Sequence, residues 1–348
     1  MFTNKRIAAL TAVSTALVAA SLIAGVFFGS VPVSVSDILR ILFGKLFHMN
    51  LFEGDRNIEM IVWTIRFSRV ILAFLVGASL ALAGAAFQGL LRNTLADPYT
   101  IGVSSGASLG AVLVLFFHVP ATFLAGYLQP VAAILFGFLT LLLVLGISHY
   151  STGRMSNQTI ILAGVIISSF MSAFISLMIA LSPREDLSNI LNWTMGSVAM
   201  RGWGHVALIL PFFLIGGFLI LIHARELNAM ALGEQSARFS GMDVKRKKQL
   251  ILIGASILTG GAVAVSGAIG FVGLVIPHLV RLIIGANHRH VLPFSLVLGG
   301  SYLVLADLAA RMVIAPRELP IGVITALIGA PIFAWLLIKQ RKKMANRV

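Results

Sequence analysis

The residues that could take part in chemistry are few in this chain. Of its 348 residues, 12 are Asp or Glu, 26 are Lys or Arg, and none is Cys. An ATP-binding P-loop needs the pattern G-x-x-x-x-G-K-[ST], but the single Gly44-Lys45 pair is followed by Leu46. The zinc motif H-E-x-x-H is absent as well, and a chain without cysteine has no disulfide and no thiolate metal site. We therefore expect neither enzyme activity nor a cofactor on this chain.

Two pairs of polar residues could still suggest a site. His288 and His290 in the string ANHRH could bind a metal, but no carboxylate or third histidine lies nearby, so we interpret them as part of a cationic inner loop. Asp307 is the acid placed well within an apolar segment, and Arg311 follows it by four residues on the same helical face. We expect a structural ion pair there rather than a proton relay.

The elements that carry these residues must be membrane helices. The chain is 58% hydrophobic and 11% charged, with a mean hydropathy of +0.98, whereas soluble domains carry about 25% charged residues. A spanning helix takes about 20 residues. Apolar runs between polar breaks predict an all-α protein with ten spans, near 7–28, 67–90, 99–118, 129–149, 158–181, 205–223, 249–268, 270–286, 291–310 and 320–338.

The distribution of charge predicts the orientation. Ten spans put both termini on one side, and that side carries 17 basic and 4 acidic residues, against 9 basic and 8 acidic residues on the other. The positive-inside rule then makes both termini cytoplasmic in a multi-pass protein of the cytoplasmic membrane. The same rule accounts for the net charge of +14 and the basic run KQRKK near the C-terminus, so we expect no nucleic-acid partner.

Several segments between or within the spans have features of their own. The external stretch 30–66 contains an amphipathic string that we expect to form a short surface helix, and 182–204 could form another. The stretch 225–248 is the only sizeable polar segment on the inner side and so a natural docking surface. The apolar run 249–286 is too long for one span, and its glycines and Pro277 favour two helices joined by a tight turn.

Small residues recur at four-residue intervals and include an internal repeat. The stripe that begins with Gly77 and Ala81 is typical of closely packed membrane helices. The string GASLALAGA, which starts at Gly77, aligns without gaps on GGAVAVSGA, which starts at Gly260. The two strings lie five spans apart and so run in opposite directions, as in the inverted repeats of transport folds.

Three long strings resemble a known family. They are RFSRVILAFLVGASLALAGAAFQGLLRNTLADPYTIGVSSGASLGA (66–111), GAIGFVGLVIPHLVRLIIGANHRHVLPFSLVLGGSYLVLADLAAR (267–311) and ELPIGVITALIGAPIFAWLL (318–337). They are similar to the FecCD/BtuC-type permeases of ATP-binding-cassette (ABC) importers for iron–siderophore, haem and cobalamin uptake. The resemblance implies one transmembrane domain over 1–348 with the type II importer fold, and a permease dimer with the pathway on its two-fold axis. It also implies a cytoplasmic ATPase dimer that binds ATP and Mg²⁺, and an extracytoplasmic binding protein.

The resemblance also implies roles for particular residues at the inner side. The string LGEQSARFSG (232–241) is similar to the loop that couples the permease to its ATPase, although the family favours Glu-Ala-Ala where this chain has Gln235-Ser236-Ala237. The strings RNTLADP (92–98) and RMSNQ (154–158) are similar to the cytoplasmic gate, with Thr94 where the family usually has proline. The residues implied are Gly233, Glu234, Arg238 and Gly241 for coupling, and Asn93, Leu95, Ser156 and Asn157 for the gate.

At the outer side, the resemblance implies that Arg66, Arg69 and Arg311 receive acidic residues of the binding protein, although the family has proline where this chain has Ser68. A ferric siderophore is the expected cargo, with cobalamin and haem as alternatives. A homodimer and a heterodimer are both compatible with the sequence. An ion-coupled secondary transporter is the alternative class, but it would need a coupling-ion site, and no carboxylate cluster is evident. An intramembrane enzyme would need a nucleophile with a base, or a set of metal ligands, inside the spans.

Overall fold

The computed structural model describes residues 4–29, 31–120, 127–152 and 156–345, and this part of the chain contains helices and no strands. Seven helices are long and apolar enough to cross a membrane, and three shorter apolar helices accompany them. Each of these ten overlaps one predicted span, which confirms the all-α fold. The long helices are α1 (Asn4–Phe27), the continuous helix α3–η1–α4 (Arg56–Leu91), α6 (Leu128–Thr152), α7 (Asn157–Leu181), α9 (Gly202–Ile222), α12 (Val244–Ser266) and α14 (His288–Met312). The shorter apolar helices are α5 (Val103–Phe116), α13 (Val272–Ile284) and the part Ile321–Leu336 of α15 (Ile321–Ala345).

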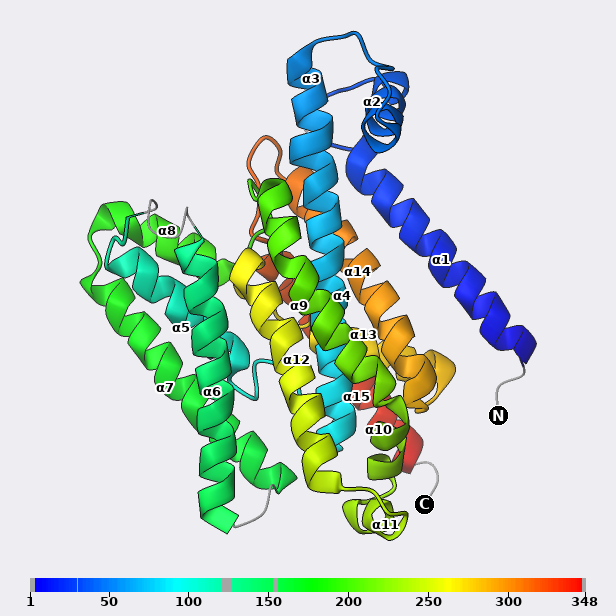
Figure 1. The fold of residues 1–348 in the computed structure, drawn as a ribbon, viewed down its shortest axis with the longest axis vertical. Coiled ribbons are helices and arrows are strands. Elements are labelled where there is room, and N and C mark those ends of the chain that lie inside the picture. Colours follow the sequence, from blue (N-terminus) through cyan, green and yellow to red (C-terminus); the bar gives the residue numbers. More distant parts are fainter. Residues whose placement is uncertain (1–3, 30, 121–126, 153–155, 346–348) are drawn as a thin grey trace.

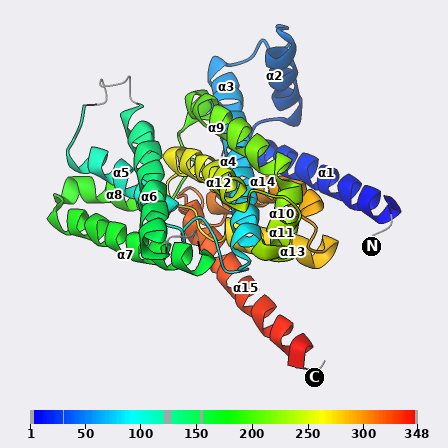
Figure 2. The same cartoon turned by 60° about the horizontal axis from the view of Figure 1, so that its bottom comes forward.

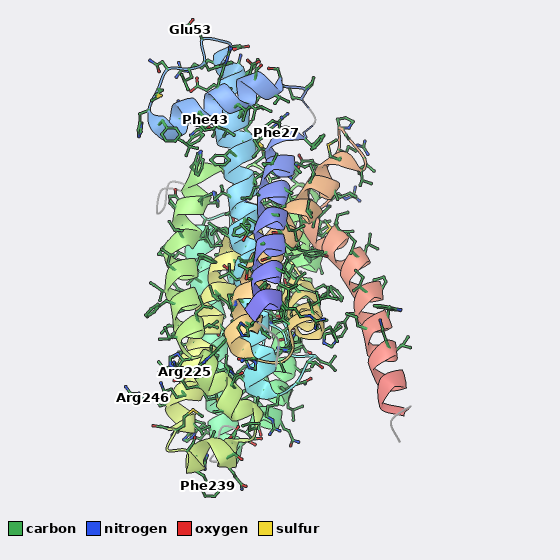
Figure 3. All side chains as sticks on the ribbon, turned by 90° about the vertical axis from the view of Figure 1, so that its right-hand side faces the viewer. Phe27, Phe43, Glu53, Arg225, Phe239 and Arg246 are labelled. Carbon is green, nitrogen blue, oxygen red and sulfur yellow. The ribbon has the colours of Figure 1, made fainter. Side chains whose placement is uncertain are left out.

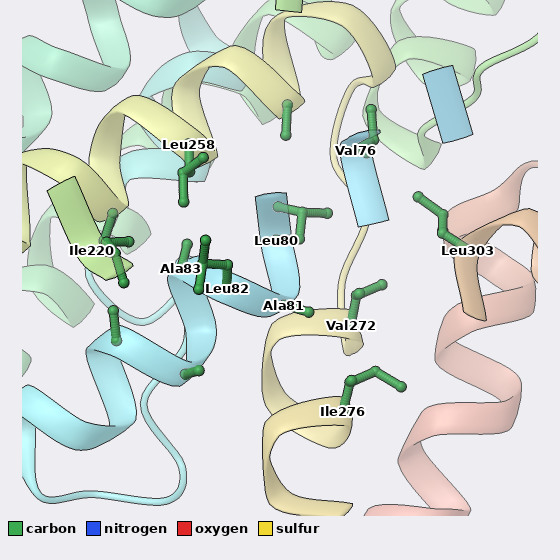
Figure 4. Close-up of a cluster of buried hydrophobic side chains, with 14 of the residues drawn as sticks. Val76, Leu80, Ala81, Leu82, Ala83, Ile220, Leu258, Val272, Ile276 and Leu303 are labelled. Atoms are coloured by element: carbon green, nitrogen blue, oxygen red, sulfur yellow. The ribbon is translucent and has the colours of Figure 1, made fainter. Parts of the chain in front are cut away.

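Helix α4 (Ser68–Leu91) is the centre of the bundle and is buried along nearly its whole length (Figure 1). Its side chains meet those of α9, α12, α13 and α14, as the cluster around Leu80 and Val272 shows (Figure 4). Glycine allows the close approach that packing in lipid requires. A Cβ on Gly77 would overlap the carbonyl oxygen of Gly299, and one on Gly84 would overlap the backbone of Gly273. The stripe starting at Gly77 is therefore a packing seam, as predicted.

The predicted short and broken elements are present. The amphipathic string forms α2 (Val35–Phe47), whose first turn is capped by the Ser34 hydroxyl, and 182–204 contains α8 (Arg184–Met195). The run 249–286 is divided into α12 and α13, as expected. One boundary was wrong, because the second spanning helix begins well before residue 67. It starts as α3 (Arg56–Met60), capped by Asp55, and continues through the π-helix η1 (Ile61–Phe67), whose Trp63 packs on Trp203.

The two long helices of the sequence repeat run in opposite directions and have similar continuations. Helix α4 descends in Figure 1 while α12 ascends, and each is followed by an irregular segment and a short helix, α5 or α13. A residue with positive φ directly precedes each short helix: Gly102 (φ 92°) before α5 and Phe271 (φ 68°) before α13. This arrangement agrees with the predicted inverted repeat.

The bundle has two distinct ends. We call the end with α2 and α3 the outer end and the end with α10 (Ala224–Ala231) and α11 (Glu234–Phe239) the inner end, after the predicted orientation (Figure 1). The start of α1 and the end of α15 both point toward the inner end. Figure 2 shows that α15 diverges from the bundle towards its C-terminal end.

Candidate functional site

The predicted coupling residues form a small protruding unit at the inner end. Helix α11 is only six residues long, and Gly233 and Gly241 flank it with φ values of 124° and 85°. Residues with a side chain rarely adopt these values, so the backbone needs glycine at both turns. Phe239 is 91% exposed at the tip of the unit, below Arg225 and Arg246 in Figure 3. An exposed aromatic at this place is suited to contact a partner.

The two predicted gate connections meet beside this unit. After α4 ends at Leu91, the side chain of Asn93 accepts a hydrogen bond from the Leu95 N–H at 2.9 Å, which forms a turn with Leu95 half-exposed. Arg154 lies outside the described residues, but Ser156 precedes α7 and Asn157 begins it. Asn157 Nδ2 donates to the Leu90 carbonyl at 3.3 Å. The second connection therefore contacts the helix that leads into the first.

The first gate connection turns back into the bundle through a buried carboxyl group. Asp97 Oδ1 accepts a hydrogen bond from the Thr100 N–H at 2.8 Å, and the Asp97 N–H donates to the Thr100 hydroxyl at 3.0 Å. Burial raises the pKa of Asp97 to about 6, although the hydrogen bond from the Thr100 N–H to its carboxyl group opposes the rise. The turn holds Pro98 close to Gly273 at the start of α13.

A cleft of about 650 Å³ brings the coupling and gate residues together at the inner end. Five of the predicted residues line it: Ser156 and Asn157 of the gate, and Gly233, Glu234 and Arg238 of the coupling unit. Asn93, Leu95 and Gly241 do not. Lys248, which the sequence analysis did not select, lines the same cleft and donates to Glu234 Oε1 at 2.9 Å. The spacing could have indicated that Lys248 faces the protein, because it follows the apolar Val244 by four residues and so lies on the same face of α12.

The three predicted docking arginines gather at the outer end but point into the protein. Their exposed fractions are 4% for Arg66, 7% for Arg69 and 7% for Arg311. Arg69 donates to Asp307 at 2.8–3.0 Å and to Glu318 at 3.0 Å. Arg311 contacts the same Asp307 at 3.2 Å, so the predicted pair of Asp307 and Arg311 is present. Their docking role stays a prediction.

Backbone carbonyl oxygens of the N-terminal segment complete the cluster. Arg66 donates to the carbonyls of Val26 and Val31, and Arg311 donates to the carbonyl of Gly25 at 3.0 Å. These arginines therefore tie the end of α1 to η1 and α14.

At the inner end, His288 is buried and hydrogen-bonded to Asn228 rather than part of a solvated loop. Among the described residues no group of three His, Cys, Asp or Glu is placed to hold a metal.

Comparison with known proteins agrees with this architecture. The model of the FecCD transport family matches residues 17–339. The chain is 50% identical to an uncharacterised ABC transporter permease protein, YvrB, of Bacillus subtilis, covering 97% of this chain and 96% of the relative. It is 39% identical to the hemin transport system permease protein HmuU of Yersinia pestis, covering 82% and 85%.

A solved structure shares the fold as well as the sequence. It is described as an inward-facing conformation of a metal-chelate type ABC transporter, and it superimposes with a TM-score of 0.81 at 34% identity. The match covers 94% of this chain and 97% of the other. These comparisons, together with the apolar helices, show that the chain is a multi-pass membrane protein and belongs to the FecCD transport family of ABC importer permeases.

Proposed function

We propose that this permease imports a metal chelate across the cytoplasmic membrane and that its cargo is a ferric siderophore. Import driven by a partner is supported by the cleft at the inner end, where residues of the coupling unit and of both gate connections lie together. The siderophore follows from the family resemblance. Such an arrangement suits a permease whose pathway opens and closes in response to a partner at this end. The inner end is cytoplasmic in this account, with both termini on that side.

The partner at the inner end is an ATPase dimer, which binds ATP and Mg²⁺ in place of this chain. Phe239 is the anchor that α11 offers to it, because aromatic side chains at the centre of an interface contribute much of the binding energy. Phe239→Ala is expected to lower the amount of cognate ATPase that copurifies with the permease at least tenfold. Tyr150→Ala removes another 91% exposed aromatic from the end of α6 and is the matched control. Equal copurification of both variants would count against the placement.

At the outer end the partner is an extracytoplasmic binding protein that delivers the chelate. The geometry supports docking at Arg66, Arg69 and Arg311 only if acidic groups of the partner reach the rim of this buried cluster. Arg66 is the best position at which to test docking, since its side chain donates hydrogen bonds to backbone carbonyls and forms no ion pair with a carboxylate of the described residues. Arg66→Glu should weaken binding-protein affinity more at low than at high ionic strength. An unchanged affinity at low ionic strength, in a variant that still folds, would rule out the role.

The pathway forms between two permease protomers, either two copies of this chain or this chain with a related one. Cobalamin and haem are the alternative cargoes, and the similarity to a hemin permease supports the inclusion of haem. The test is reconstitution of the permease with its ATPase and binding protein in liposomes, followed by uptake of a ferric siderophore, hemin and cobalamin in parallel. Preferential uptake of hemin or cobalamin would replace the siderophore. Uptake without the ATPase would favour the ion-coupled secondary transporter.

A further inference from the structure

A buried lysine connects the coupling unit to the gate. The Lys248 side chain is 2% exposed, and its Nζ donates to Glu234 Oε1 at 2.9 Å and to Oδ1 of Asn157. Asn157 in turn donates to the carbonyl of Leu90, in the last turn of α4. A chain of polar contacts thus runs from α11 through α12 and α7 to the helix that precedes the first gate connection.

Because Lys248 is buried, its charge depends on these contacts. An ammonium group loses its hydration on burial, so it needs acceptors that replace water. Its three N–H donors can serve a carboxylate and an amide oxygen at the same time. Separation of Glu234 from Asn157 would leave the charge without one of its acceptors. The two groups are therefore expected to move together, or to exchange partners in a defined step.

We propose that Lys248 is a positioning residue that transmits displacement of α11 to the cytoplasmic gate. The short α11 can shift as a unit between the turns at Gly233 and Gly241, and a shift of Glu234 changes the acceptors around the Lys248 ammonium group. That change displaces Asn157 and the end of α4. The inference rests on the proposed function, because it requires that α11 contacts the ATPase.

The neighbouring lysine offers a matched control. Lys247 forms an ion pair with Glu226 at 2.9 Å, and its side chain is 34% exposed, against 2% for that of Lys248. It joins α12 to α10 and does not contact either gate connection in the described structure. Lys247→Met and Lys248→Met remove the same charge from adjacent positions of one helix. Only the second removes a contact with the gate.

The experiment measures the accessibility of the gate directly and needs no transported chelate. Leu95→Cys places a single thiol on the half-exposed turn of the first gate connection, in a chain that has no other cysteine. The variant is reconstituted with its cognate ATPase, and the rate of labelling by a maleimide fluorophore is measured with and without ATP, Mg²⁺ and vanadate. We expect ATP to change the rate at least threefold in Leu95→Cys alone and when Lys247→Met is added.

Addition of Lys248→Met should abolish the ATP-dependent change while the complex continues to hydrolyse ATP. A merely structural role would instead lower the recovered complex and its hydrolysis together. Lys248→Arg keeps the charge and donors and should restore at least half of the change. If Lys248→Met gives no complex, Asn157→Leu tests the same link from the gate side and should also abolish the change.

The failure of this inference is distinguishable from that of the proposed function. A full ATP-dependent change in both Lys248→Met and Asn157→Leu would overturn the role of Lys248 but not the importer. An assembled Leu95→Cys complex whose labelling rate does not respond to ATP would overturn the coupling function itself, and this inference with it.

Discussion

Asp307 forms ion pairs with two arginines at the outer end, and its side chain is 1% exposed. The Asp307–Arg311 pair could be predicted from its four-residue spacing on one helix. The contact of Asp307 with Arg69 spans 238 positions, and no local pattern indicates it. A buried charge network of this kind is expensive to break, because removal of one partner leaves the others desolvated and unpaired.

Asp307→Asn is therefore expected to destabilise the folded permease by about 3–5 kcal/mol, since it leaves two buried arginines with less negative charge. Glu318→Gln is the control, because Glu318 is 42% exposed and its pairing with Arg69 is worth about 0–1 kcal/mol. The measurement is thermal or denaturant unfolding of the purified permease in detergent. Equal, small losses in both variants would contradict the buried-network account.

Asp97 gives a prediction about pH. Burial raises its pKa to about 6, against about 3.9 in an unfolded chain, so ionisation at neutral pH costs on the order of 3 kcal/mol. Because the folded-state pKa is the higher one, the stabilising contribution of the protonated carboxyl is complete below pH 4 and is lost as the pH rises through 6. Asp97→Asn keeps an oxygen acceptor for the Thr100 N–H without the charge.

The Asp97→Asn permease should consequently unfold at a higher temperature than the parent at pH 7.5, and the difference should shrink towards pH 5. Unfolding curves in matched buffers across this range measure it. A difference that stays constant with pH, or that grows as the pH falls, would show that Asp97 is not ionised at a cost in the folded protein.

At the scale of elements, local sequence predicted the existence of helices better than their ends. The amphipathic string and the glycine-rich break gave α2 and the division between α12 and α13, because each has a local cause. The early start of the second spanning helix had a weaker local signal, the aspartate at position 55 that caps α3. Its extension through α3 and η1 depends on the packing of Trp63 against Trp203, which lies 140 residues away.

The turn after α11 offers a test of the coupling role proposed for this helix. Gly241 has a φ of 85°, and no atom outside its immediate neighbours lies within 4 Å of a Cβ built there. Gly241→Val therefore adds backbone strain of about 1–3 kcal/mol without a steric clash. We expect it to displace α11 and to reduce ATPase copurification and transport, while the permease still inserts.

Gly146→Ala is the matched control, because Gly146 also has open space but lies within helix α6. Alanine in a helix is favoured over glycine by up to about 1 kcal/mol, so copurification and transport should stay at the parent level. Full ATPase stimulation and transport by Gly241→Val would argue against α11 as the coupling element.

At the scale of the molecule, a helix lies at each of the ten predicted spans, and seven of these helices are long and apolar enough to cross a membrane. Sequence hydropathy could not show how they are arranged. The central position of α4 follows from glycine contacts such as Gly77 with Gly299, which lie far apart in sequence. The strings around Arg66 and Gly267 identified the family, and the family comparison then agreed over 17–339. The cleft at the inner end needed the folded chain, because its residues come from five separate segments.

The orientation can be tested with single cysteines, since the chain has none of its own. Asp243 caps α12 at the inner end and Lys343 lies in the last turns of α15, whereas Asp55 caps α3 and Arg184 begins α8 at the outer end (Figure 1). A membrane-impermeant maleimide added to intact cells should label Asp55→Cys and Arg184→Cys only. Labelling of Asp243→Cys or Lys343→Cys in intact cells would contradict the ten-span topology or its orientation.

The proposed function requires that ATP hydrolysis on a partner drives transport through this permease. The most direct measurement is uptake of a radiolabelled ferric siderophore into liposomes that contain the permease and its ATPase, with the binding protein supplied on the outer side. We expect uptake that requires ATP inside the liposomes, is abolished by vanadate and is unaffected by an ionophore that collapses ion gradients. Uptake that persists without ATP and disappears with the ionophore would contradict the account.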